Sequence, residues 1–454
     1  MWLPNLLKEI NEADMKSLGM EISADDIYSV NHSSLKDAIV QFGGGCTGEL
    51  ISSKGLLITN HHCGFSQIQS LSTIEKNYLK DGFWSGSIEE EIPCAGLTAT
   101  FIKEIIDVTE SVLFNVNDTL NEDDRATIIK LRTDSIEKSV GGKLKVFVRA
   151  FYHGNKYYLF KTEVFTDVRF VGAPPQSIGK FGGETDNWMW PRHTGDFSLF
   201  RIYSDKDNQP AAYSKDNVPF TPKQYLTINI KGVNENDFIF VFGFPGSTFQ
   251  YIPASSLDVI ASQKNPNRIS IRDSRLNIMR EAMNRNDTTR LQYSAKFYTL
   301  ENPYKKWKGE QIGFKRFDVI KKKKKQEEVF MNNLKGNSSL VKDSSLLLAF
   351  DSLNNITRPL NFAIDYYVDA FPGIELLNVS NRFKTIIASC SVKAQDDKGY
   401  KNEVQKLRKD LKSFYKNYNI EVDRSICNSM LEQTFAKVEE KFIPEIIIRE
   451  GKKR

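Results

Sequence analysis

The sequence predicts an α+β fold in which a β-rich region, residues 1–254, precedes an all-helical region, residues 255–454. Turn residues give the first argument, because residues 1–254 hold 21 of the 27 glycines and 10 of the 15 prolines. Short apolar runs that are typical of strands lie between these turns. The second region instead contains long segments with the apolar spacing of helices and dense charge on their outer faces.

The composition is that of an ordinary globular chain with room for two or three domains. Of its 454 residues, 40% are hydrophobic and 26% are charged, and the net charge is +5. This small excess favours neither nucleic acid nor a membrane surface as a partner. No apolar run approaches the roughly 18 residues that span a bilayer. The five cysteines include no CxxC pair, which argues against a zinc ribbon or a thioredoxin-like site.

Two β-hairpins are the clearest local predictions in the first region. Residues 49–52 and 56–59 are short runs joined by a turn in which Gly55 can take positive φ. Residues 143–152 and 156–164 predict the second hairpin. The remaining predictions are strands at 97–108, 167–171, 197–202, 226–230 and 238–242, helices within 1–40 and at 67–82 and 117–140, a loop at 82–96, and a core-facing stripe of Ala126, Ile129, Leu131 and Ile136.

The second region predicts a series of helices, and two of the expected boundaries fall beside Pro303 and Pro359. The expected helices are 255–300, 305–333, 338–356, 359–371 and 402–418. Residues 321–325 are consecutive lysines, followed by Glu327 and Glu328. We interpret this run as a solvated helical face and not as a nucleic-acid patch.

The second strand of the first hairpin is expected to end in His61-His62-Cys63, a pair of histidines beside a cysteine that is unusual in a chain with five histidines. An imidazole in such a place can act as a general base that activates a hydroxyl nucleophile. Cys46 lies across the hairpin, and a bridge from it to Cys63 would staple the loop that carries the histidines. A purely structural histidine pair and a zinc site are the alternatives, although adjacent histidines point in different directions and rarely bind one metal. The order of strand, histidine and cysteine resembles the trypsin-like serine peptidases, which implies that the base is His62.

A second informative stretch, residues 181–203, combines tryptophans, an arginine, a histidine and aspartates in what must be mostly loop. Asp196 lies at the head of the strand predicted at 197–202. In trypsin-like peptidases the carboxylate that orients the histidine lies at such a strand entrance, so we expect Asp196 to hold His62, with Asp186 as the rival. The alternative is that Asp196 only caps a turn and that Trp188 and Trp190 belong to the core.

Three motifs together resemble the S46 family of bacterial dipeptidyl-peptidases. They are TNHHCG at 59–64, DNWMWPRHTGDFSLFR at 186–201 and FGFPGST at 242–248. The resemblance covers nearly the whole chain and implies a chymotrypsin-like double β-barrel with a large inserted helical domain. It also implies release of dipeptides from free peptide N-termini, with His62 as base and Asp196 as its carboxylate. Asn187 and Trp188 would bind the substrate's α-amino group.

The same resemblance implies a periplasmic or secreted homodimer with no cofactor and no metal, and an oxidising compartment would suit a Cys46–Cys63 bridge. Residues 1–20 nevertheless lack the basic segment, apolar segment and cleavage site of a signal peptide. No Gly-Asp/Asn-Ser-Gly turn follows Asp196, and the nearest serine after a glycine, Ser247, lacks the second glycine. We therefore expect a chain without the nucleophile and with an incomplete second barrel.

Two other functions fit the same residues. A catalytically inactive protein could bind peptide N-termini through Asn187 and Trp188. A metallohydrolase would need His61, His62 and His193 around one ion, and the spacing of these residues gives it little support.

Overall fold

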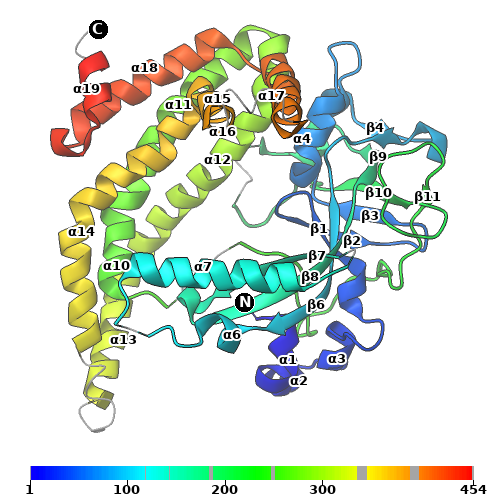
Figure 1. Ribbon diagram of the computed structural model, residues 1–454, viewed down its shortest axis with the longest axis horizontal. Coiled ribbons are helices and arrows are strands. Elements are labelled where there is room, and N and C mark those ends of the chain that lie inside the picture. Colours follow the sequence, from blue (N-terminus) through cyan, green and yellow to red (C-terminus); the bar gives the residue numbers. More distant parts are fainter. Residues whose placement is uncertain are drawn as a thin grey trace. The chain divides into compact units, whose positions relative to one another are not determined.

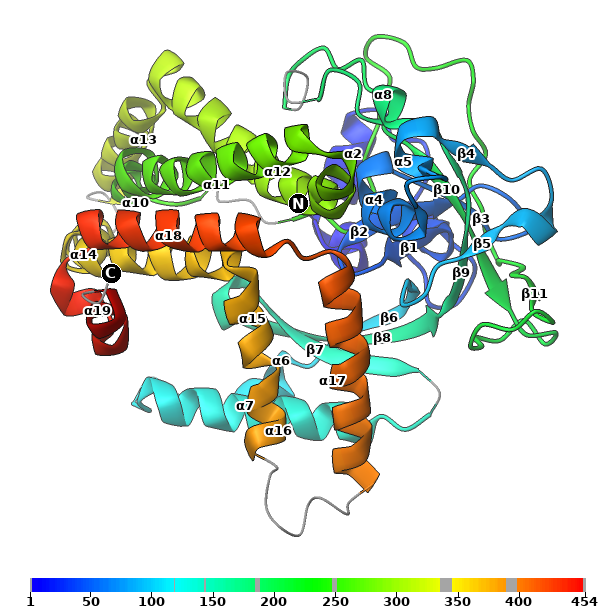
Figure 2. The same cartoon turned by 90° about the horizontal axis from the view of Figure 1, so that it is seen from above.

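The structure is a computed structural model that describes residues 2–117, 119–142, 144–183, 188–246, 251–334, 345–388 and 398–451. The chain forms two compact units (Figures 1 and 2). The first, unit 1, comprises Met1–Phe181 and Thr194–Thr248, and the second, unit 2, comprises Gly182–His193 and Phe249–Arg454. The predicted mixture of an antiparallel sheet and many helices is confirmed. The domain boundary at residue 254 stays a prediction.

Unit 1 is built on one sheet whose strand pairs are all antiparallel among the described residues. Its strand order is β4-β9-β10-β3-β2-β1-β6-β8-β7, with β11 beside β10 and β5 beside β9. The strands are β1 Ile39–Phe42, β2 Cys46–Leu50, β3 Leu56–Thr59, β4 Phe83–Trp84, β5 Ile92–Pro93, β6 Ala99–Asp107, β7 Lys145–Phe151, β8 Lys156–Phe165, β9 Asp167–Ala173, β10 Ser198–Ser204 and β11 Val218–Pro219.

Both predicted hairpins are confirmed. In the first, Leu50 pairs with Leu57, and Gly55 in the connecting turn has a φ of +63°. Strand β10 lies on the other side of β3, where Ser198 pairs with Thr59. The sheet is held by aromatic packing, since the ring centroids of Phe42 and Phe200 are 4.8 Å apart and both side chains are buried. This contact joins β1 to β10, two strands that are separated by β2 and β3 in the strand order.

Helices and short elements complete unit 1. They are η1 Pro4–Leu6, α1 Leu7–Ile10, α2 Glu12–Ser17, α3 Ala24–Ile27, η2 Leu35–Ala38, α4 His61–Leu71, α5 Tyr78–Asp81, η3 Ile88–Glu90, α6 Thr109–Leu113, α7 Glu122–Ser139, η4 Tyr152–Gly154 and α8 Gln176–Gly179. Helix α7 lies beside β7 (Figure 1) but buries none of its side chains, and Leu131 is 64% exposed. The predicted core-facing stripe is therefore wrong for Ala126 and Leu131, whereas Ile129 and Ile136 are half-buried.

Some predictions for unit 1 need correction. The helix predicted at 67–82 is two helices, α4 and α5, and the loop at 82–96 contains the short strands β4 and β5. The strands predicted at 226–230 and 238–242 are not formed, although both segments are apolar. Phe238 and Phe242 instead pack against the buried side chains of the N-terminal helices. A strand needs a neighbour along its length. The amide of Leu226 donates to the backbone oxygen of Leu50 in β2, but no described ladder continues along either segment.

Unit 2 is helical in the described part of the chain. Its helices are α10 Ala254–Val259, the π-helical turn η5 Ile260–Lys264, α11 Asn265–Arg285, α12 Asp287–Arg316, α13 Val319–Leu334, α14 Leu346–Asp369, η7 Phe371–Gly373, α15 Glu375–Asn381, α16 Phe383–Ala388, α17 Lys398–Lys416, α18 Ile420–Lys437, η8 Glu440–Phe442 and α19 Glu445–Gly451. Helices α11 and α12 pack along each other (Figure 2) around buried Met279, Tyr293 and Phe297. An ion pair between Arg272 and Asp369, with a nitrogen–oxygen distance of 2.7 Å, joins α11 to α14.

The helix boundaries predicted at the prolines are wrong. Pro303 lies inside α12 and Pro359 lies inside α14. The break falls instead at Asn286, which is extended and whose side chain accepts a hydrogen bond from the amide of Thr289. The lysine run at 321–325 lies on α13 and is largely exposed, as expected for a solvated face. Within the described residues, no helix is both long enough and apolar enough to cross a bilayer.

The turn at Gly55 yields a testable prediction. An added Cβ there would lie 2.8 Å from the backbone oxygen of Ile202 and 2.9 Å from that of Phe220. Together with the positive φ, this should make Gly55→Ala lower the free energy of unfolding by about 1–3 kcal/mol, measured by urea denaturation. The matched control is Gly141→Ala, whose Cβ meets no described atom within 4 Å. Equal stability of both variants would contradict the assigned turn.

Candidate active site

The two histidines lie in the first turn of helix α4, directly after strand β3. The strand ends at Thr59, Asn60 is the N-cap, and the helix begins at His61. The prediction that the histidines end a strand is therefore corrected by this early helix start. The helical turn sends the two imidazoles to different environments, because His61 is 1% exposed while the side chain of His62 is 57% exposed.

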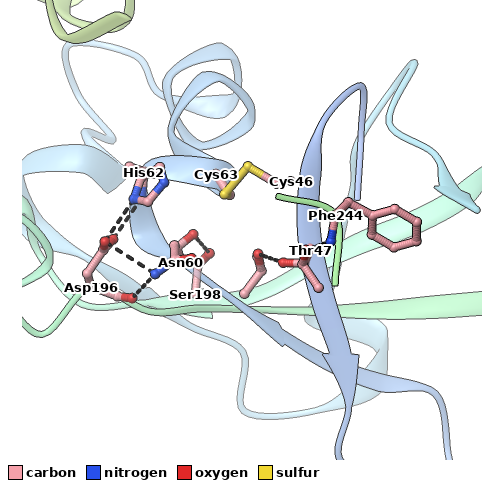
Figure 3. The surroundings of a disulfide bond; sticks show 9 residues. Cys46, Thr47, Asn60, His62, Cys63, Asp196, Ser198 and Phe244 are labelled. Atoms are coloured by element: carbon pink, nitrogen blue, oxygen red, sulfur yellow. Dashed lines mark hydrogen bonds and ion pairs between the residues drawn. A yellow bond between two sulfur atoms is a disulfide. The ribbon is translucent and has the colours of Figure 1, made fainter. Parts of the chain in front are cut away.

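Asp196 meets the start of this helix (Figure 3). Its carboxylate accepts a hydrogen bond from Nδ1 of His62 at 2.8 Å and another from the backbone amide of His62 at 3.0 Å. The side-chain amide of Asn60 donates to the same carboxylate and to the backbone oxygen of Asp196, both at 3.3 Å. The Asp196 side chain is only 11% exposed. The structure thus brings together the two residues that the sequence paired.

The surrounding backbone is tied by side-chain hydrogen bonds and by a disulfide (Figure 3). Ser198 donates to the backbone oxygen of Asn60 at 2.9 Å, which joins the start of β10 to the start of α4. Thr59 donates to the backbone oxygen of Thr47 at 2.6 Å, which joins β3 to β2. Cys46 and Cys63 form the predicted disulfide, so the residue after His62 is covalently joined to β2.

His61 is buried beside the aromatic ring of Phe65, whose centroid lies 5.7 Å from that of the imidazole. Its Nε2 is buried and has no hydrogen-bond partner among the described residues. Burial lowers the pKa of His61 below its usual value of 6.5, although the charge of Asp196 acts in the opposite direction. Burial therefore disfavours a positive charge on the ring next to the exposed His62.

Metal binding finds little support at this site. The described residues contain one group of candidate ligands close together, which is Cys46, His62 and Cys63. Both sulfur atoms of this group are joined in the disulfide and offer no thiolate. The ring of His61 is buried away from this group, so the two histidines do not form a shared site.

Trp188 lies in unit 2, where its indole N–H donates to the side-chain oxygen of Asn302 at 2.8 Å and to its backbone oxygen at 3.0 Å. Trp188 and Trp190 are 56% and 92% exposed, so the alternative that they belong to the core is wrong. Asp186, Asn187 and Ser247 lie outside the described residues. The positions of Asp196 and its predicted rival Asp186 relative to His62 therefore cannot be compared.

The sequence interpretation missed several residues at these sites. Asn60 carries a local signal, because an asparagine before a new helix is a typical N-cap. Ser198 and Asn302 carry no such signal, since their partners are far away in sequence. A further serine follows glycine and asparagine at Gly336-Asn337-Ser338, but Ser339 replaces the second glycine and these residues lie outside the described part.

The sequence profile of the Peptidase S46 family matches residues 1–449. The chain belongs to this family. It is 43% identical to the Asp/Glu-specific dipeptidyl-peptidase of Capnocytophaga gingivalis, over 94% of this chain and 60% of that protein. It is 39% identical to the dipeptidyl-peptidase 7 of Phocaeicola vulgatus, over 95% of this chain and 61% of that protein.

Solved structures agree with this assignment. DPP11 of Porphyromonas endodontalis in complex with the dipeptide Arg-Asp superposes with a TM-score of 0.84 at 35% identity, over 98% of this chain and 64% of that one. The resemblance found from the sequence motifs is confirmed. The chain spans about 60% of the length of the relatives it matches.

The disulfide should contribute measurably to stability. It closes a loop of 17 residues, for which the loss of chain entropy in the unfolded state predicts about 3 kcal/mol. The double variant Cys46→Ser/Cys63→Ser should lose about this much free energy of unfolding. Dithiothreitol should destabilise the wild type to the same extent and leave the double variant unchanged. An effect of the reductant on the variant would assign the loss to other cysteines.

The buried His61 predicts acid sensitivity. Because its pKa is lowered in the folded state, its contribution is present above about pH 6.5 and is lost as the pH falls below that value. His61→Phe should reduce the dependence of unfolding free energy on pH between about 7 and 5, by at most about 1.4 kcal/mol per pH unit. Phe65→Leu, a packing change beside the same ring, should lower stability without altering this slope. Urea unfolding at each pH measures both.

Proposed function

We propose that this chain carries the general base and the orienting carboxylate of a serine-type dipeptidyl-peptidase that releases dipeptides from free peptide N-termini. The observation that carries the proposal is the 2.8 Å contact between Asp196 and Nδ1 of His62. A carboxylate only accepts hydrogen bonds, so it holds the proton on Nδ1 and leaves Nε2 with a free lone pair. That nitrogen can take the proton of a serine hydroxyl during attack on a peptide carbonyl.

Burial supports the division of roles between the two residues. The carboxylate is shielded and receives three hydrogen bonds from the start of α4, whereas the imidazole is half exposed and can meet a substrate. The buried carboxylate stabilises the imidazolium that forms when His62 takes a proton. Ser198 donates to the backbone of Asn60 and so supports the base instead of serving as a nucleophile.

The reaction also needs a nucleophile and an oxyanion hole. We place both in the part of the relatives' length that this chain does not match, together with the rest of a second β-barrel. We also propose that the helical region is a domain inserted into this double β-barrel. One relative is named as specific for Asp and Glu, and another is named dipeptidyl-peptidase 7. Because these names do not agree on one side chain, the proposed substrate class is peptides with a free N-terminus.

Fusion of this chain to the unmatched C-terminal segment of a relative tests the catalytic roles. We expect the fusion to release dipeptides from peptides with a free amino group, with acidic or apolar second residues tried in parallel. Asp196→Asn should lower kcat/KM by roughly 10³–10⁴-fold because the wrong imidazole tautomer is favoured, and His62→Ala should lower it at least as far. Asp207→Asn, an exposed loop change, is the control. Full activity of the His62→Ala fusion would refute the assignment.

Recognition of the amino group can be tested on the unfused chain. We propose that Asn187, Trp188 and Asn302 form the clamp for the α-ammonium group, since amide oxygens accept its hydrogen bonds and the indole offers a cation–π face. Asn302→Ala should weaken binding of a free-amino peptide by about tenfold in calorimetry, the effect of one lost charged hydrogen bond. The N-acetylated peptide should bind poorly to the wild type and to the Asn302→Ala variant. Asn277→Ala on α11 should leave the affinities for both peptides unchanged.

Equal binding of the free and acetylated peptides would contradict this clamp. Binding without any dipeptide release from the fusion would favour the alternative of an inactive protein that binds peptide N-termini.

A further inference from the structure

We propose that His61 is a positioning residue that fixes Asp196 relative to His62 by packing its ring against helix α8. The inference rests on the proposed function, because it concerns the same base and carboxylate. It goes beyond that function by assigning a role to the histidine that does not touch the carboxylate. The argument follows a closed series of contacts that leads from His61 to Asp196 and back to His62.

The first contact joins the imidazole to the backbone of α8. A Cβ added to Gly179 would lie 2.3 Å from Cδ2 and 2.5 Å from Cγ of His61, distances that real Cβ atoms do not reach. The backbone of Gly179 therefore lies flat against the ring, and Gly179 is itself buried. The ring nitrogen that faces Pro174 donates to the carbonyl of that residue, just before α8. Removal of the ring would therefore take away a direct support of this helix.

The second contact joins α8 to the residue before the carboxylate. The amide of Gly195 donates to the backbone oxygen of Ile178 at 3.0 Å. A Cβ on Gly195 would lie 2.8 Å from Cγ2 of Ile178, so a larger residue at this position would press on that side chain. Thr194 adds a hydrogen bond to the backbone oxygen of Phe181 at 2.9 Å. The loop that presents Asp196 therefore rests on the helix that rests on His61.

The third contact closes the series, because His61 and His62 share the first turn of α4. A displacement of α8 would move Asp196 while His62 stayed on its own helix, and the 2.8 Å hydrogen bond between them would lengthen. Small displacements of this kind weaken catalytic geometry strongly. Burial also lowers the pKa of His61, which disfavours a second positive charge beside Asp196.

Hydrogen exchange of the unfused chain tests the proposal without requiring activity. The readout is the backbone amide of His62, which donates to Asp196, together with the Nδ1 proton of the same residue seen by NMR. His61→Ala removes the ring and Gly179→Ala pushes α8 away from it. Each should raise the exchange rate of the His62 amide roughly tenfold relative to amides of β2 and β3, the loss expected for one hydrogen bond. Gly141→Ala is the matched control.

A rescue variant separates positioning from general destabilisation. His61→Phe keeps a ring against Gly179 and should hold the exchange rate of the His62 amide within about threefold of the wild type. The proposal is overturned if His61→Ala leaves this amide protected, if all amides of unit 1 lose protection together, or if phenylalanine fails to rescue.

In the fusion, His61→Ala should lower kcat more than tenfold with little change in KM. If the exchange rate of the His62 amide rises as expected but the wild-type fusion is inactive, the proposed function is overturned and the positioning role of His61 stands.

Discussion

The site depends on the interaction of the Asp196 carboxylate with the N-terminus of helix α4. The first N–H groups of a helix have no partners within it, and the helix dipole favours negative charge there by about 0.3–1 kcal/mol. Asp196 satisfies the amide of His62 and binds its imidazole at the same time. The start of the helix and the orientation of the His62 imidazole are therefore set by one charged group. Hydrogen bonds to an ionised acceptor are roughly twice as strong as neutral ones, which favours this arrangement over a simple turn cap.

The sheet explains how residues so distant in sequence meet. Strands β3 and β10 are antiparallel neighbours, so the end of one and the beginning of the other lie at the same edge. The pairing of Thr59 with Ser198 then places Asn60 and Asp196 next to each other. Register in a buried sheet is strongly specified, because a shift by one residue would turn Phe200 out of the core. The distance between the His62 imidazole and the Asp196 carboxylate thus depends on core packing.

Local patterns predicted the parts of this site that depend on local chemistry. The hairpin around Gly55 and the strand after Asp196 follow from turn residues and apolar alternation, and both are formed. The early start of α4 could have been recognised from Asn60. The link between His61, Gly179 and Gly195 could not, because it arises only when a short helix packs between segments distant in sequence. For the same reason, apolar segments such as 226–230 look like strands even though no described ladder continues along them.

Proline was also a misleading guide in the helical unit. Pro303 and Pro359 lie inside long helices whose other residues are held by tertiary packing and by ion pairs such as Arg272–Asp369. The loss of one backbone hydrogen bond costs about 3 kcal/mol in an isolated helix, and burial of neighbouring side chains can offset it. Asn286 ends its helix more effectively because its side chain offers the backbone a competing partner.

The excursion of the chain between Phe181 and Thr194 has an evolutionary meaning. Its ends are joined by the hydrogen bond from Thr194 to Phe181, yet the residues between them, Gly182–His193, belong to the other compact unit. Because a hydrogen bond joins the ends of this segment, the segment can change in length or sequence while Asp196 keeps its place beside the sheet. Selection could therefore reshape the surface around Trp188 without disturbing the contact between His62 and Asp196. Such separability would let one scaffold diversify its preferences while conserving its chemistry.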